Sequence, residues 1–128
     1  MNHYEANDQE AIFKWAAYMS GQCPELKLLY HIPNEGKRAA YTGHRLKLQG
    51  MKAGVPDMCL PVARGSFHGL YIELKHGKHK PTPEQTQWIH NLREQGYCAA
   101  VCYGWEETVR FITNYLNNKL IKGVYDVN

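Results

Sequence analysis

The feature that most constrains the fold of this chain is a six-residue segment that begins at Leu70 and reads Leu-Tyr-Ile-Glu-Leu-Lys. Successive side chains of a β-strand point to opposite faces of a sheet. The apolar residues Leu70, Ile72 and Leu74 therefore point to one face, where a core can form. Glu73 and Lys75 lie together on the other face. The alternation predicts a strand with one apolar face and one face that carries adjacent opposite charges.

The other periodic segments predict helices around further strands. Helices are predicted over residues 8–19, 83–95 and 105–117. Strands are predicted over residues 26–32, 57–63 and 97–103, and residues 37–53 form either a helix or an ordered loop. This order predicts an α/β fold, a small mixed β-sheet flanked by helices, in a single domain over residues 1–128.

The start of the helix after the central strand is the best-defined boundary. Thr82 can cap the helix, Pro83 suits its first turn, and the Gln85 side chain can complete a capping box. Gly96 is expected to end the same helix.

Basic residues are concentrated in the middle of the chain. Residues 36–81 contain nine Lys or Arg and only two acidic residues, Asp57 and Glu73, whereas the rest contains six basic and ten acidic residues. A basic stretch in an otherwise acidic chain favours a polyanionic partner, with nucleic acid as the first candidate. A solvated basic loop is the alternative.

Composition excludes several classes of protein. The 128 residues are 44% apolar and 21% charged, as in a globular domain, and no apolar run approaches the ~20 residues of a membrane span. No secretory signal is visible, so we expect a cytoplasmic protein, in the host cytoplasm if it is viral. The four cysteines form no C-x-x-C pair, which argues against structural zinc, and Cys98 and Cys102 are expected to be buried thiols.

The two isolated acids point to a metal site. Asp57 opens the strand that precedes Glu73 in a predicted hairpin, so the two carboxylates can lie side by side. Their repulsion disfavours that arrangement unless a cation lies between them, and Mg²⁺ commonly takes one or two carboxylates together with water and substrate oxygens. Lys75 could then orient a nucleophile or stabilise charge on a phosphate. A cross-strand salt bridge on a solvated face is the alternative.

Several short motifs occur in a particular order. They are Gly54-Val55-Pro56-Asp57, Gly69-Leu70-Tyr71-Ile72-Glu73-Leu74-Lys75 and Gln85-Thr86-Gln87-Trp88, with shorter matches at Ile32-Pro33-Asn34, Arg38, Gln49-Gly50, Gly96-Tyr97 and Gly104-Trp105. Over roughly residues 5–117, this set resembles the VRR-NUC (virus-type replication-repair nuclease) branch of the PD-(D/E)xK nuclease superfamily. The resemblance implies a restriction-endonuclease-like αβββαβα core and metal-dependent cleavage of DNA.

The resemblance also implies roles for individual residues. Asp57 and Glu73 match the metal ligands, and the main-chain carbonyl of Leu74 matches a third ligand. Lys75 matches the catalytic lysine, and Gln85 matches a glutamine that starts the following helix close to the site. The implied cofactor is Mg²⁺ or Mn²⁺.

The family also has a glutamate on its first helix, four residues before a glutamine. Glu5 and Gln9 fit that spacing, whereas Glu10 does not. At ~100° per residue, Glu5 and Gln9 share the inward stripe of Ile12 and Ala16, and Glu10 points away from it. Glu5 is therefore the predicted site residue, and a charge favoured by the helix dipole is the alternative explanation.

The residues predicted to contact DNA are basic and surround the candidate site in the sequence. They are Lys37, Arg38, Arg45, Lys47, Lys52, Lys78 and Lys80. His76 and His79 are interpreted as part of a cationic surface rather than as a metal pair. Tyr41 and Phe67 are the aromatic candidates for contact with unpaired bases.

These features together predict a Mg²⁺- or Mn²⁺-dependent endodeoxyribonuclease. Stand-alone members of the family resemble Holliday-junction resolvases, and a chain of this size leaves little room for further recognition domains, so we expect a homodimer that cleaves branched DNA. A flap, nicking or restriction-like nuclease is the alternative among enzymes. A non-catalytic nucleic-acid-binding protein with the same fold is the alternative from another class.

Overall fold

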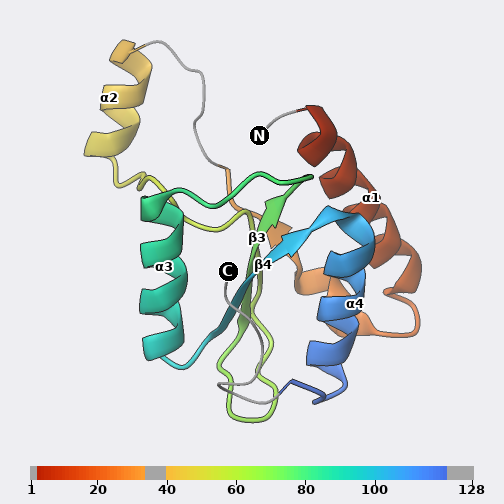
Figure 1. Ribbon diagram of the computed structural model, residues 1–128. Helices are drawn as coiled ribbons and strands as arrows, with labels where there is room; N and C mark the ends of the chain where they lie inside the picture. The colour runs from red at the N-terminus through yellow and green to blue at the C-terminus, as the bar shows by residue number, and fades with distance from the viewer. Residues whose placement is uncertain (1–2, 34–39, 121–128) are drawn as a thin grey trace.

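Four strands form one mixed sheet with helices on both faces (Figure 1). The computed structural model describes residues 3–33 and 40–120. Its helices are α1 (His3–Met19), the short 3₁₀ helix η1 (Pro24–Leu28), α2 (Ala40–Leu48), α3 (Pro83–Glu94) and α4 (Gly104–Leu116). Its strands are β1 (Tyr30–His31), β2 (Met58–Leu60), β3 (Leu70–Lys75) and β4 (Cys98–Tyr103). They lie in the order β1-β2-β3-β4, and only the pair β3–β4 is parallel. The predicted fold class is confirmed.

Strand β3 separates two apolar clusters. Leu70, Ile72 and Leu74 are fully buried in the larger cluster, to which α1 adds Ile12 and α4 adds Ile112. The opposite face of the sheet packs against α3. Figure 1 shows the same division, with α3 on one side of the sheet and α1 and α4 on the other. The predicted alternation is therefore confirmed, and Glu73 and Lys75 lie on the face that α3 covers.

The predicted strand over residues 26–32 is confirmed only for Tyr30–His31, and its first half is wrong. Pro24–Leu28 form η1, and only Tyr30–His31 pair with β2. Leu26 and Leu29 are both buried, and their spacing of three is the repeat of a 3₁₀ helix rather than of a strand. Pro24 also suits the first turn of a helix.

Three other elements differ from the predictions by more than one residue. Helix α1 begins at His3 rather than at residue 8, and within the described part of residues 37–53, which starts at Ala40, α2 covers Ala40–Leu48. Strand β2 covers Met58–Leu60 within the predicted residues 57–63. It stops before Pro61, which has no N–H to donate to a sheet.

The start of α3 has the predicted capping box. The Gln85 N–H donates to Thr82 Oγ1 at 3.2 Å, and the Thr82 N–H donates to Gln85 Oε1 at 2.8 Å. The helix ends at Glu94, before Gly96, which has the positive φ (+91°) that favours glycine.

The cysteines belong to the interior. Cys59, Cys98 and Cys102 are buried and Cys23 is half-buried, all as free thiols, and the prediction for Cys98 and Cys102 is confirmed. Within residues 3–33 and 40–120, no helix has the length and apolar character needed to cross a membrane.

The loop before β2 passes very close to the first turn of α3. Gly54 has φ +88°, and a Cβ at this position would lie 2.7 Å from the main-chain carbon of Glu84. Glycine is needed here both for the backbone conformation and for the space. Because Asp57 follows shortly afterwards, the contact ties the segment that carries Asp57 to α3.

Gly54→Ala is expected to destabilise the protein more than Gly50→Ala. Gly50 also has a positive φ (+106°), but a Cβ there would meet nothing within 4 Å, so its replacement should lower the free energy of unfolding by about 1–2 kcal/mol. Gly54→Ala adds a backbone clash and should lower it by at least ~1 kcal/mol more. Urea denaturation of both variants measures the difference, and equal losses would contradict the close approach.

Candidate active site

Asp57 and Glu73 meet at one end of the sheet, where β2 begins and β3 ends. Met58 pairs with Ile72 in the antiparallel register, so Asp57 and Glu73 are the next opposite residues. The Leu74 N–H donates to Asp57 Oδ2 at 2.7 Å, which holds the aspartate side chain against β3. The structure therefore brings the two carboxylates together.

Lys75 and Gln85 contact the same oxygen of Glu73. Lys75 Nζ lies 3.5 Å from Glu73 Oε2, and Gln85 Nε2 donates to Glu73 Oε2 at 3.2 Å. Only 4% of the Glu73 side chain and 11% of the Lys75 side chain are exposed. A buried carboxylate with a cation and an amide donor is a fixed group rather than half of a solvated surface salt bridge.

The capping box of α3 orients Gln85 toward the site. Its Oε1 accepts from the Thr82 N–H, so its amide nitrogen is the atom that faces Glu73. The sequence predicted that Gln85 completes the cap of α3 and that it lies near the site. In the structure, its side chain makes both contacts, one with the Thr82 N–H and one with Glu73. The start of α3 thereby sets the position of the Glu73 carboxylate.

Burial and like charge shift the titration of both carboxyl groups. Burial, together with the charge of Asp57, raises the pKa of Glu73 to about 9, although the Lys75 ammonium opposes the shift. Burial also raises the pKa of Asp57, against the hydrogen bond from the Leu74 N–H. Both pKa values are raised because the nearby positive charge does not fully compensate for the burial of the two carboxyl groups.

Helix α1 brings a third carboxylate toward this pair. Glu5 is buried, with 7% of its surface exposed, whereas Glu10 is exposed on another face of the helix. The charge of Glu5 raises the pKa of Asp57. Gln9 lies one turn after Glu5, and within the described residues its buried Oε1 has no hydrogen-bond partner. The predicted inward stripe thus has the expected geometry.

Two histidines connect the segment after β3 to α1. His76 Nδ1 lies 3.4 Å from Asp8 Oδ2, and His79 Nδ1 lies 3.7 Å from Glu5 Oε2. In Figure 1 this segment runs from the first turns of α1 across to the start of α3. The sequence analysis missed both pairs, because nothing near His76 or His79 in the sequence indicates which carboxylates they meet.

The predicted DNA-contacting residues that the structure describes are all exposed and lie on three segments. Arg45 and Lys47 are exposed on α2, Lys52 is exposed in the loop before β2, and Lys78 and Lys80 are exposed after β3. The predicted Lys37 and Arg38 lie outside the described residues.

One aromatic prediction is wrong. Phe67 cannot stack on a base, because it is 4% exposed and packs in the core 6.1 Å from the ring of Tyr115. A short antiparallel bridge between Arg64 and Phe67 closes the loop that carries this ring. The side chain of Tyr41, the other aromatic candidate, lies outside the described part.

The donor groups at the site fit a hard divalent cation. Among residues 3–33 and 40–120, no three His, Cys, Asp or Glu side chains are grouped as a metal site. Asp57 and Glu73 nevertheless offer two adjacent carboxylates, and burial together with the charge of Asp57 raises the pKa of Glu73. Mg²⁺ and Mn²⁺ accept such a pair and complete their coordination with carbonyl, water and substrate oxygens. The carbonyl of Leu74, between Glu73 and Lys75, stays the predicted third ligand.

The mixed sheet with helices on both faces is the fold of a nuclease-type family, as two comparisons with known proteins show. The sequence model of the VRR-NUC domain family matches residues 3–106, and the chain belongs to this family. It is similar to a solved structure described as a VRR_NUC domain protein, with 30% identity, a TM-score of 0.77 and coverage of 99% of both chains. No curated protein matches the sequence. The predicted family is confirmed.

Glu73→Gln is expected to reduce the pH dependence of stability in the metal-free protein. Because the pKa of Glu73 rises from 4.5 to about 9 on folding, the folded protein keeps a proton that the unfolded chain releases. The resulting stabilisation is complete below pH 4.5 and is lost as the pH rises toward 9. The neutral amide that replaces the carboxyl group avoids this loss, so the variant should be more stable than wild type at pH 8 by at least ~1 kcal/mol.

Urea denaturation in EDTA at pH 5 and pH 8 measures this effect. Glu10→Gln, on the exposed face of α1, is the control and should follow the wild type. A Glu73→Gln variant with the wild-type pH dependence would contradict the raised pKa.

Proposed function

We propose that this protein is a metal-dependent endonuclease that hydrolyses the phosphodiester bonds of DNA. The observation that carries the proposal is the pairing of Asp57 and Glu73 with Lys75 at the end of β3. Family membership supports a nuclease-type activity. The exposed basic residues on α2 and after β3 supply the positive charge that a DNA backbone requires.

In this proposal, Asp57, Glu73 and the Leu74 carbonyl hold Mg²⁺ or Mn²⁺. The bound ion supplies the Lewis acidity that activates water and neutralises charge on the reacting phosphate. Lys75, held beside Glu73, orients the nucleophile or stabilises the negative charge that develops on the phosphate. The Gln85 amide keeps the Glu73 carboxylate in place. Glu5, on α1, adds a third carboxylate at the edge of the site.

We further propose that the substrate is branched DNA and that the active form is a homodimer, which would present two sites to two strands. A flap, nicking or restriction-like nuclease would use the same residues on a different DNA.

A non-catalytic DNA-binding protein is less consistent with the site. Buried carboxylates next to phosphates oppose binding unless a cation lies between them, and Asp57, Glu73 and Lys75 are all retained. The cleavage experiment separates these two classes.

Asp57→Asn and Glu73→Gln are expected to abolish cleavage while DNA binding stays equal or becomes stronger. Each change removes a proposed metal ligand and a negative charge near phosphate. Since even the outer partners of metal ligands contribute ~10–100-fold to activity, the loss should exceed ~100-fold. Labelled junctions, flaps and duplexes incubated with Mg²⁺, Mn²⁺ or EDTA measure it. Glu10→Gln is the matched control, and full turnover by either site variant would reject the site.

Removal of Lys47 and Lys52 is expected to weaken DNA binding for all sequences alike. If both residues contact phosphates, the double alanine variant should reduce the slope of log affinity against log salt by about two, at ~0.9 for each lost contact. The control is the double alanine variant of Lys14 and Lys27, which are exposed on α1 and η1 and carry the same total charge. Equal slopes for the two double variants would exclude this surface from the DNA interface.

A further inference from the structure

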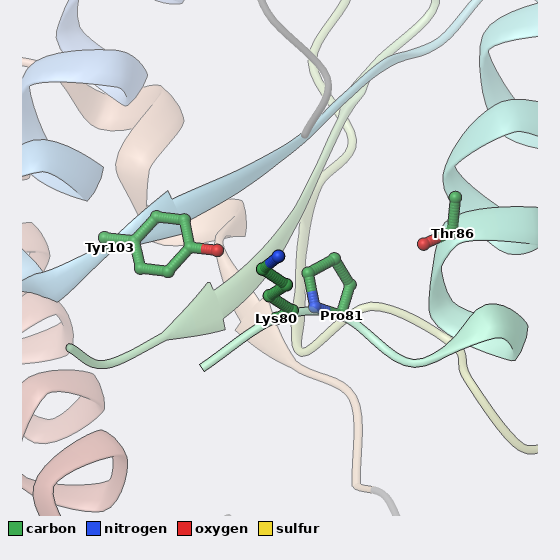
Figure 2. A pocket seen from close by; sticks show the side chains of 4 residues that line it. All are labelled: Lys80, Pro81, Thr86 and Tyr103. Carbon is green, nitrogen blue, oxygen red and sulfur yellow. The ribbon is translucent and has the colours of Figure 1, made fainter. Parts of the chain in front are cut away.

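A pocket lies close to the end of β3 that carries Lys75, and none of its lining residues is among the proposed metal-binding or catalytic groups. It is lined by Lys80, Pro81, Thr86 and Tyr103, at the junction of β4, the segment after β3 and the first turns of α3 (Figure 2). Its volume is about 390 Å³, within the range of ~300–1,000 Å³ of small-molecule sites. Figure 2 shows the hydroxyl groups of Tyr103 and Thr86 directed toward the segment of Lys80 and Pro81.

The pocket adjoins the candidate active site through the sheet. Tyr103 pairs with Lys75 in the parallel register of β3 and β4, so the two side chains are neighbours on the same face. Both strands end at this point, and the carboxyl ends of parallel strands are the usual place for a ligand in α/β sheets. A substrate held at Lys75 would therefore extend naturally toward Tyr103.

The lining residues have the chemistry of a nucleotide site. Lys80 is exposed and makes no ion pair within the described part of the chain, so its ammonium group is available to a phosphate. Tyr103 is half-buried, and its N–H donates to Glu107 Oε2 at 2.8 Å, which anchors the main chain beneath the ring. An anchored aromatic ring is a stacking surface for a base, and Thr86 adds a hydroxyl group that can donate or accept.

We propose that this pocket binds the unpaired base of a nucleotide next to the cleaved phosphate, with Tyr103 against the base and Lys80 on the adjoining phosphate. The inference rests on the proposed action on DNA. A base inside a duplex is stacked on both faces and must leave the stack to enter such a pocket. The pocket therefore selects DNA with an unpaired nucleotide beside the cleaved bond over continuous duplex.

Base binding can be measured without cleavage. Oligonucleotides that carry one 2-aminopurine, whose emission responds to stacking, at successive positions around the mapped cleavage site are titrated with protein in EDTA. Wild type should change the emission at one flanking position, and Tyr103→Leu should remove that change. Tyr18→Leu, the same substitution at a tyrosine of α1 that is 84% exposed, should retain it. No responsive position, or a response that survives in Tyr103→Leu, would overturn the proposal.

Selectivity is measured with two DNAs that differ only in whether the nucleotide at that position is paired. Wild type should cleave the unpaired form about tenfold faster, in line with the contribution of one stacked base. Tyr103→Leu should lose this preference and still cleave the paired form. An undiminished preference in Tyr103→Leu would overturn the proposal.

Lys80→Gln provides a second variant that does not depend on the packing of Tyr103. It should weaken binding of the unpaired DNA and reduce the slope of log affinity against log salt by about 0.7–0.9, whereas Lys14→Gln should leave both unchanged. Thermal melting shows whether Tyr103→Leu folds. If it does not, an unaltered DNA affinity and an unaltered salt slope in Lys80→Gln would overturn the proposed role of the pocket.

The two proposals fail in different ways. Absence of metal-dependent cleavage of any DNA by wild type would reject the proposed nuclease. Metal-dependent cleavage that is insensitive to Tyr103 and Lys80 would reject the pocket alone.

Discussion

The site depends on the withdrawal of two adjacent carboxyl groups from water. Glu73 is 3% exposed next to Asp57, and the burial and repulsion that raise its pKa also oppose folding of the metal-free protein. Three groups offset this effect: the Lys75 ammonium, the Leu74 N–H and the Gln85 amide. All three belong to β3 or α3, so regular elements of the fold hold the carboxyl groups in place before any ligand arrives.

Several contacts link the stability of the fold to the geometry of this site. Gln85 caps α3 and contacts Glu73 with the same side chain. The loop that carries Asp57 is pressed against α3 at Gly54, and the segment after β3 is connected to α1 by His76 and His79. Changes at these positions therefore act on the carboxylates through the elements that hold them.

The family match and the structural match differ in extent, and most of α4 lies in the difference. The family model ends at residue 106, near the start of α4, whereas the solved VRR_NUC domain protein matches 99% of the chain. Ile112 and Tyr115 of α4 are nevertheless buried in the larger core cluster, and the Tyr115 hydroxyl donates to the Val62 carbonyl at 2.6 Å. The core that packs against this sheet is thus completed by α4, most of which lies beyond the residues that the family model matches.

The sequence alone determined the features that depend on residues a few positions apart. The alternation of β3, the cap of α3 and the inward side of Glu5 follow from strand and helix periods, and the hairpin then predicts that Asp57 approaches Glu73. Tertiary structure decided the rest. Leu26 and Leu29 pack at helical spacing in a run that is typical of a strand, and Phe67 turns into the core. His76 meets Asp8, and Tyr103 lies beside Lys75, only after distant segments pack together. Local periodicity cannot encode such contacts, because their partners are selected by the shape and charge of surfaces that exist only in the folded chain.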